Sequence, residues 1–140
     1  MKERRTKAIN ANKKNTSAFI EQLVADINAM KPGFVCYYDR APKSAKFPYC
    51  VVSAITASDL AAGDLSMFDI EIWTDDKLPT ATEDLESICD DLRNFLHNKI
   101  ISQEGVFAGH IGYESRDTFD DREKDLSHRR LVFAARLFYY

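Results

Sequence analysis

Residues 67–73 read Met-Phe-Asp-Ile-Glu-Ile-Trp, with large apolar side chains at 68, 70 and 72 separated by the acidic residues Asp69 and Glu71. Successive side chains of a β-strand point to opposite faces of its sheet. The alternation therefore predicts a strand that buries one face and leaves the other polar. It is the clearest two-residue period in the chain, and the other predicted elements are arranged around it.

Two stretches with helical spacing lie on either side of this strand. Both have apolar residues three or four positions apart, which is typical of a helix with one buried stripe. The first stripe begins near Thr16, ends before Pro32, and consists of Phe19, Ile20, Leu23, Val24, Ile27 and Met30. The second follows a predicted capping box of Thr80 and Glu83 and consists of Leu85, Ile88, Cys89, Leu92, Phe95 and Leu96.

The remaining apolar runs predict further strands at residues 34–38, 49–55, around 111–113, and 129–140. Residues 39–46, 58–63 and 114–125 are predicted to be loops or turns, and the last of these is a dense run of charge. The predicted order is helix, three strands, helix, two strands. Strands in runs with few helices favour an α+β fold. We expect one domain over residues 16–140, a mostly antiparallel β-sheet with two α-helices packed on one face.

Composition agrees with a single globular domain. The chain has 140 residues, of which 45% are hydrophobic and 29% are charged. This excludes collagen, a coiled-coil rod and a wholly disordered chain. No apolar run approaches the length of about 20 residues that crosses a bilayer, and no apolar segment of a secretory signal follows the charged start.

Charge is distributed unevenly along the chain. Residues 1–15 carry six basic residues against one acidic residue, a net of +5, while the rest carries −8 and the total is −3. The basic residues are Lys2, Arg4, Arg5, Lys7, Lys13 and Lys14. This segment is interpreted either as a loose, solvated terminus or as a basic arm that contacts nucleic acid or an acidic neighbouring subunit. The acidic remainder argues against a duplex DNA-binding domain.

The sequence contains none of the motifs that hold phosphate, a catalytic serine or a zinc ion. Cys36, Cys50 and Cys89 are scattered among apolar neighbours, which predicts structural thiols and a reducing compartment. The carboxylates of residues 114–125 have no glycine at the position that a calcium loop requires, so we interpret the segment as a solvated loop or, alternatively, one that docks on a partner. Arg129 and Arg130 are adjacent in a predicted strand, so they point to opposite faces and make a poor anion clamp. We therefore expect no catalytic residue, no cofactor and no metal site.

Taken together, the elements resemble the bacteriophage tail terminator proteins, also called tail completion proteins, of long non-contractile tails. Residues 47–52, Phe-Pro-Tyr-Cys-Val-Val, resemble the family's FPYVV strand entry, and residues 68–74 resemble its apolar strand that ends in tryptophan. Residues 88–97 resemble the helix of the I-x-x-x-L-R-x-x-L-H type, and residues 128–136 resemble the terminal strand with a basic residue ahead of alternating apolar positions. The resemblance covers about residues 16–140 by the order of its elements.

The resemblance implies a structural protein of the virion and not an enzyme. Family members form a hexameric ring that caps the tail tube, ends its polymerisation and provides the surface that joins the head. The implied partners are further copies of the chain, the tail tube protein and a head-completion or connector protein, with DNA passing through the lumen without sequence-specific binding and no membrane contact. The implied location is the head-proximal end of the tail, and the host cytoplasm before assembly.

Two sets of contact residues are predicted for a ring of this kind. Arginine is enriched at protein interfaces, so four arginines are predicted to make subunit contacts: Arg116, Arg129, Arg130 and Arg136. Leu60 and Leu65, in a predicted loop over residues 58–67, are predicted to face the tail tube. A head-to-tail connector or neck protein is the alternative from the same setting, and a small host α+β binding module is the alternative from another class.

Overall fold

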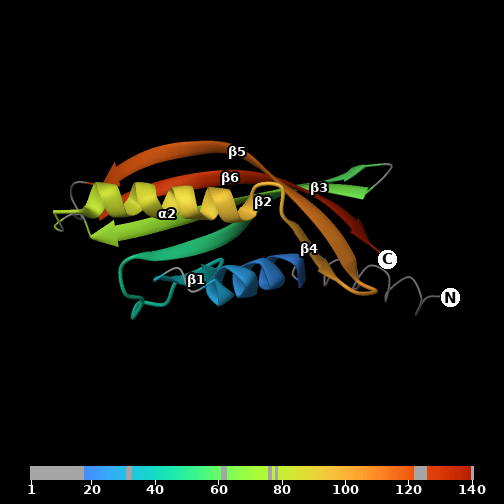
Figure 1. The fold of residues 1–140 in the computed structure, drawn as a ribbon, viewed down its shortest axis with the longest axis horizontal. Coiled ribbons are helices and arrows are strands. Elements are labelled where there is room, and N and C mark those ends of the chain that lie inside the picture. The colour runs from blue at the N-terminus through green and yellow to red at the C-terminus, as the bar shows by residue number, and fades with distance from the viewer. Residues whose placement is uncertain are drawn as a thin grey trace.

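The computed structural model describes residues 18–30, 33–60, 63–75, 77, 79–121 and 126–139. They form two helices and one mixed, mostly antiparallel sheet of six strands in the order β1-β2-β3-β6-β5-β4. The strands are β1 (Val35–Tyr38), β2 (Tyr49–Leu60), β3 (Gly63–Asp75), β4 (Ile100–Gln103), β5 (Phe107–Asp121) and β6 (Leu126–Tyr139). The helices are an N-terminal helix that covers residues 18–29 and α2 (Ala81–Leu96). The predicted α+β fold is confirmed, and Figure 1 shows the long strands arching over both helices.

The core lies between the helices and one face of the sheet. Phe68 of β3 stacks on Phe133 of β6 with ring centroids 5.3 Å apart, and Phe19 of the N-terminal helix meets Phe68 edge-on at 5.9 Å. Phe19 also meets Phe107 of β5 edge-on at 5.8 Å. These four rings are fully buried, so they join the first helix to three strands that follow it much later in the chain. The alternation predicted for residues 67–73 is confirmed, because the side chains at 68, 70 and 72 are buried.

The pairing also confirms a sheet that is mostly antiparallel. Only β1 and β2 run parallel, with Cys36 opposite Cys50, whereas β2, β3, β6 and β5 pair antiparallel in turn. Irregular register interrupts β2 between Ala54 and Thr56 and β5 between Tyr113 and Ser115. Such bulges change which side chains of a strand face the core.

Four details of the sequence prediction were wrong. The segment after Tyr113 is not a loop, because β5 continues to Asp121 and pairs with β6 along its length. The strand β4 was missed, since four residues with one buried side chain give no periodic signal. The turn predicted over residues 58–63 is shorter, because β2 extends to Leu60 and β3 begins at Gly63. The capping box at Thr80 does not form, because the Thr80 hydroxyl donates to Asp84 Oδ2 at 3.0 Å instead.

Candidate functional site

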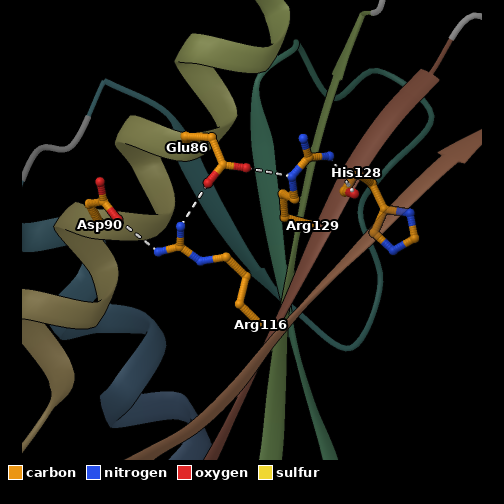
Figure 2. Close-up of polar contacts among 5 residues, drawn as sticks. All are labelled: Glu86, Asp90, Arg116, His128 and Arg129. Carbon is orange, nitrogen blue, oxygen red and sulfur yellow. Dashed lines mark hydrogen bonds and ion pairs between the residues drawn. The ribbon is translucent and has the colours of Figure 1, made fainter.

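Two arginines from neighbouring strands meet two carboxylates of α2 beneath the sheet. Arg116 Nη1 lies 2.7 Å from Glu86 Oε2 and Arg116 Nη2 lies 2.8 Å from Asp90 Oδ1. Arg129 Nε donates to Glu86 Oε1 at 2.7 Å. We call these four residues the arginine cluster. Figure 2 shows both guanidinium groups extending from the strands toward Glu86, which bridges them, while the His128 ring lies on the other side of its strand.

Local structure explains why these side chains converge. Glu86 and Asp90 are four residues apart on α2, so their carboxylates lie on one face of the helix. Arg129 shares the parity of the buried Leu131 along β6, which directs it toward the helix. The bulge before Ser115 shifts the parity of β5 by one residue and places Arg116 opposite Leu131, on the same face. Without that bulge, Ser115 would face α2 in place of Arg116.

Charge is balanced inside the arginine cluster. The hydrogen bond from Arg129, followed by the charges of Arg129 and Arg116, holds the pKa of Glu86 below its ordinary value despite partial burial. The Arg129 side chain is 7% exposed and that of Arg116 is 21% exposed, so carboxylate partners are needed to offset lost hydration. The carboxylates of Glu86 and Asp90 already neutralise the two guanidinium groups, so these groups are not available to bind an anionic ligand. We therefore interpret the cluster as a structural contact that joins α2 to β5 and β6.

The opposite face of the sheet is not covered by either helix. Arg130 Nε donates to Asp69 Oδ2 at 2.8 Å, and the Asp69 side chain is only 8% exposed. The His128 ring stacks on Trp73 with centroids 4.0 Å apart, and its Nε2 lies 3.8 Å from Glu71 Oε2. Burial, and then the nearby charge of Asp69, raises the pKa of Glu71. We call this side of the sheet the open face.

The four predicted contact arginines are thus divided between the two faces. Arg116 and Arg129 lie in the arginine cluster, Arg130 is ion-paired on the open face, and Arg136 is exposed on the open face. The prediction that Arg129 and Arg130 point to opposite faces is confirmed. A role of any of the four in subunit contacts stays a prediction.

The other predicted contact residues are placed only in part. Leu60 ends β2 and Leu65 lies in β3 opposite Ser58, so both belong to a hairpin and not to the predicted loop. The six basic residues of the arm lie outside the described residues.

His97 follows the last residue of α2, and its Nδ1 accepts a hydrogen bond of 3.1 Å from the Tyr113 N–H. All three cysteines are buried free thiols.

Sequence reasoning missed the acidic partners of the arginines. Glu86 and Asp90 have the i, i+4 spacing that would have marked a charged helix face, but nothing in the sequence pairs them with strands about 30 and 40 residues later. Asp69 was predicted to lie on the polar face of its strand, and it does, but its side chain is only 8% exposed and accepts a hydrogen bond from Arg130.

A cavity of about 460 Å³ lies beside the edge strand β1. Its lining includes Val35, Tyr37, Lys46 and Phe47, and Phe47 stacks on Tyr49 with centroids 5.4 Å apart.

In the part of the chain that the structure describes, no group of three or more His, Cys, Asp or Glu side chains is arranged to hold a metal ion. None of the described helices has the length and hydropathy to cross a membrane.

No family model and no curated protein matches the chain. A solved structure that carries no functional name is similar over 91% of this chain and 96% of that chain, with a TM-score of 0.60 and 14% sequence identity. At this identity the likeness shows a shared fold. A chain from the virion of a native gene transfer agent particle is a distant structural neighbour over 72% of this chain and 77% of that chain, with a TM-score of 0.47 and 20% identity. A TM-score of this size supports no inference about function.

Proposed function

We propose that this chain is a structural virion protein without enzymatic activity that forms a ring, a hexamer in the family it resembles, on the head-proximal end of a phage tail tube. There it ends polymerisation of the tube and provides the surface that joins the head, with DNA passing through its lumen. The observation that carries the proposal is the order of the family-like stretches within one domain. Residues 47–52 lead into β2, 68–74 lie in β3, 88–97 span the end of α2, and 128–136 lie in β6.

The open face supports an assembly role. Both described helices pack against the other side of the sheet (Figure 1), so neither of them covers this side. It carries the ion pair between Arg130 and Asp69, the stacked Trp73 and His128, and the exposed Arg136. We propose Arg130 and Arg136 as the arginines available to a neighbouring subunit or to another virion protein.

The solution mass of the purified chain tests the ring. We expect light scattering after size-exclusion chromatography to give a species near six times the 16.0 kDa chain mass, and negative-stain images to show a ring. A stable dimer with no larger species would contradict the proposal. Rings that bind DNA-filled heads but not tail tubes would favour the connector alternative instead.

The basic arm is tested by its charge. A heterologous ring needs two different complementary surfaces on each subunit, and a +5 arm against a −8 remainder supplies opposite charges. Replacing Lys2, Arg4, Arg5 and Lys7 by Glu should weaken ring formation or tail joining at low salt, and the matched Gln variant should weaken it less. Equal assembly of the Glu variant, the Gln variant and the wild type would exclude the arm from the interface.

A further inference from the structure

Each edge of the sheet is only half covered by its short outer strand. On one edge, β1 pairs with residues 49–52 of β2, and among the described residues no strand pairs with the outer side of residues 54–60. On the other edge, β4 pairs with residues 107–110 of β5, and the Tyr113 N–H is capped by His97. Beyond it, no described strand pairs with the outer side of residues 114–121. We call residues 54–60 and 114–121 the two open edge segments.

The outer edge of β1, in contrast, is closed by a side chain. Asn28 of the N-terminal helix donates through Nδ2 to the Cys36 carbonyl at 3.0 Å, and its Oδ1 accepts from the Cys36 N–H at 2.8 Å. An amide side chain thereby occupies the backbone groups that another strand would use. An edge that no neighbouring strand covers presents backbone N–H and C=O groups that can pair with another chain.

The pairing pattern identifies which backbone groups point outward from the open edge segments. The Ile111 N–H donates to Lys99 and its carbonyl accepts from Asn98, so Ile111 directs both groups away from β6. The bulge before Ser115 shifts this alternation by one residue, which makes Thr118 an outward residue. On the other edge, the Val52 carbonyl accepts from Asp39, and the bulge between 54 and 56 makes Ala57 an outward residue.

The two open edge segments have the opposite directions that an antiparallel contact between subunits requires, and they are similar in length. Three successive antiparallel pairings separate β2 from β5, so the two strands run in opposite directions. In a ring with rotational symmetry every subunit has the same orientation, and β5 of one subunit would meet β2 of the next antiparallel. Ala54 and Tyr113 lie on the same row across the sheet, so the open edge segments extend to opposite sides of that row. Their pairing requires neighbouring sheets to be staggered along the strands, and closure of a sheet into a barrel requires such a stagger.

We propose that residues 54–60 of one subunit pair antiparallel with residues 114–121 of the next, so that a second copy of this chain covers each open edge segment. The proposal rests on the ring of the proposed function and names the surface that builds it. Each subunit contributes two different edges, so the contact is head to tail and leaves neither open edge segment unpaired when the ring closes.

Two proline variants test the proposal, Ala57→Pro and Thr118→Pro. Proline removes the backbone N–H, and an edge position whose N–H faces solvent tolerates it within the subunit. Ala57→Ser and Thr118→Val are the matched controls that keep the N–H. Circular dichroism and urea unfolding should show that each proline variant folds as a monomer.

We expect each proline variant alone to lose the ring and each control to keep it. Mixing the two proline variants well above the concentration at which the wild type forms rings should give a one-to-one heterodimer and nothing larger. The Ala57→Pro subunit still has its β5 edge and the Thr118→Pro subunit still has its β2 edge, so only one contact can form. Native mass spectrometry would identify the heterodimer.

Three results would overturn the edge pairing. Rings formed by a folded proline variant would show that another surface builds them, and the proposed function would survive. Dimers of Ala57→Pro alone would show a symmetric contact between two β5 edges. A wild-type chain that stays monomeric at every concentration would exclude self-driven edge pairing, and capping of tail tubes by that monomer would then decide the proposed function separately.

Discussion

Gly109 of β5 lies where the first helix meets the last strand, and its replacement by alanine tests the packing of the core. An added Cβ would lie 2.5 Å from Leu137 Cδ2 and 3.2 Å from Phe19 Cε2. Carbon atoms pack at about 3.5–4 Å, so Leu137 must move by about 1 Å. Both neighbours are fully buried, which leaves little room for that movement. Overpacking of this kind costs about 1–3 kcal/mol.

Gly112 in the same strand is the matched control, because the nearest atom to its added Cβ is the Ala134 carbonyl oxygen at 3.9 Å. Replacing glycine by alanine at an unstrained site stabilises a protein by about 0.4–1 kcal/mol through the unfolded chain. Gly109→Ala should therefore be about 1–2 kcal/mol less stable than the wild type, and Gly112→Ala equal to it or slightly more stable.

Urea unfolding followed by the fluorescence of Trp73, the single tryptophan, measures both free energies of unfolding. Protein concentration must be matched, because oligomerisation adds to apparent stability. In a Leu137→Val background the cost of Gly109→Ala should fall, since the clashing Cδ2 atom is gone. Equal stability of the two alanine variants would refute the packing argument.

Two further predictions concern titration and reactivity. Hydrogen bonding from Arg129 lowers the pKa of Glu86 in the folded state, so the stability that its carboxylate contributes is present above the unfolded pKa and is lost as the pH falls through the folded pKa. Glu86→Gln should therefore lower the free energy of unfolding by about 1 kcal/mol at pH 7, a figure discounted because the side chain is 40% exposed. The loss should be smaller below pH 4. Burial and the charge of Asp69 raise the pKa of Glu71, so Glu71→Gln should gain stability relative to the wild type as the pH rises from 4 to 7. Over the same range Glu86→Gln should lose stability relative to the wild type. Urea unfolding that moved Glu71→Gln and Glu86→Gln in the same direction relative to the wild type would contradict the reasoning. Burial raises the pKa of the Cys89 thiol to about 11, so about 0.1% of it is thiolate at pH 8. A thiol-specific disulfide reagent should react with the three buried cysteines only on unfolding, and rapid reaction of the native protein would contradict their burial.

The elements with strong periodicity were predictable from the sequence alone. The alternation at residues 67–73 and the stripe of α2 report burial on one face, and burial is what the structure shows for both. Residues 114–121 were not predictable as a strand, because an edge segment with a bulge has no alternating apolar side chains to report it. The pairing with β6 forms that strand, and β6 is contributed by residues that lie further along the chain.

The candidate site was predictable only in its basic half. Arg116 and Arg129 stand out in the sequence, but a single sequence does not show that both meet Glu86. That meeting depends on the bulge that aims Arg116 at α2 and on the strand order that places β5 beside β6. Both are consequences of the whole sheet, so local patterns carry no signal for them.

The position of β6 has a consequence for how the chain folds during synthesis. This strand is the last of the six in sequence and lies between β3 and β5. Until the ribosome has released it, β3 and β5 have no strand to join them, and Phe68 and Phe19 lack the ring of Phe133 that completes their cluster. Structures dominated by such distant contacts fold slowly and expose apolar strands meanwhile. The six-stranded sheet can therefore be completed only after β6 has emerged from the ribosome, and apolar strands of the nascent chain stay exposed until then.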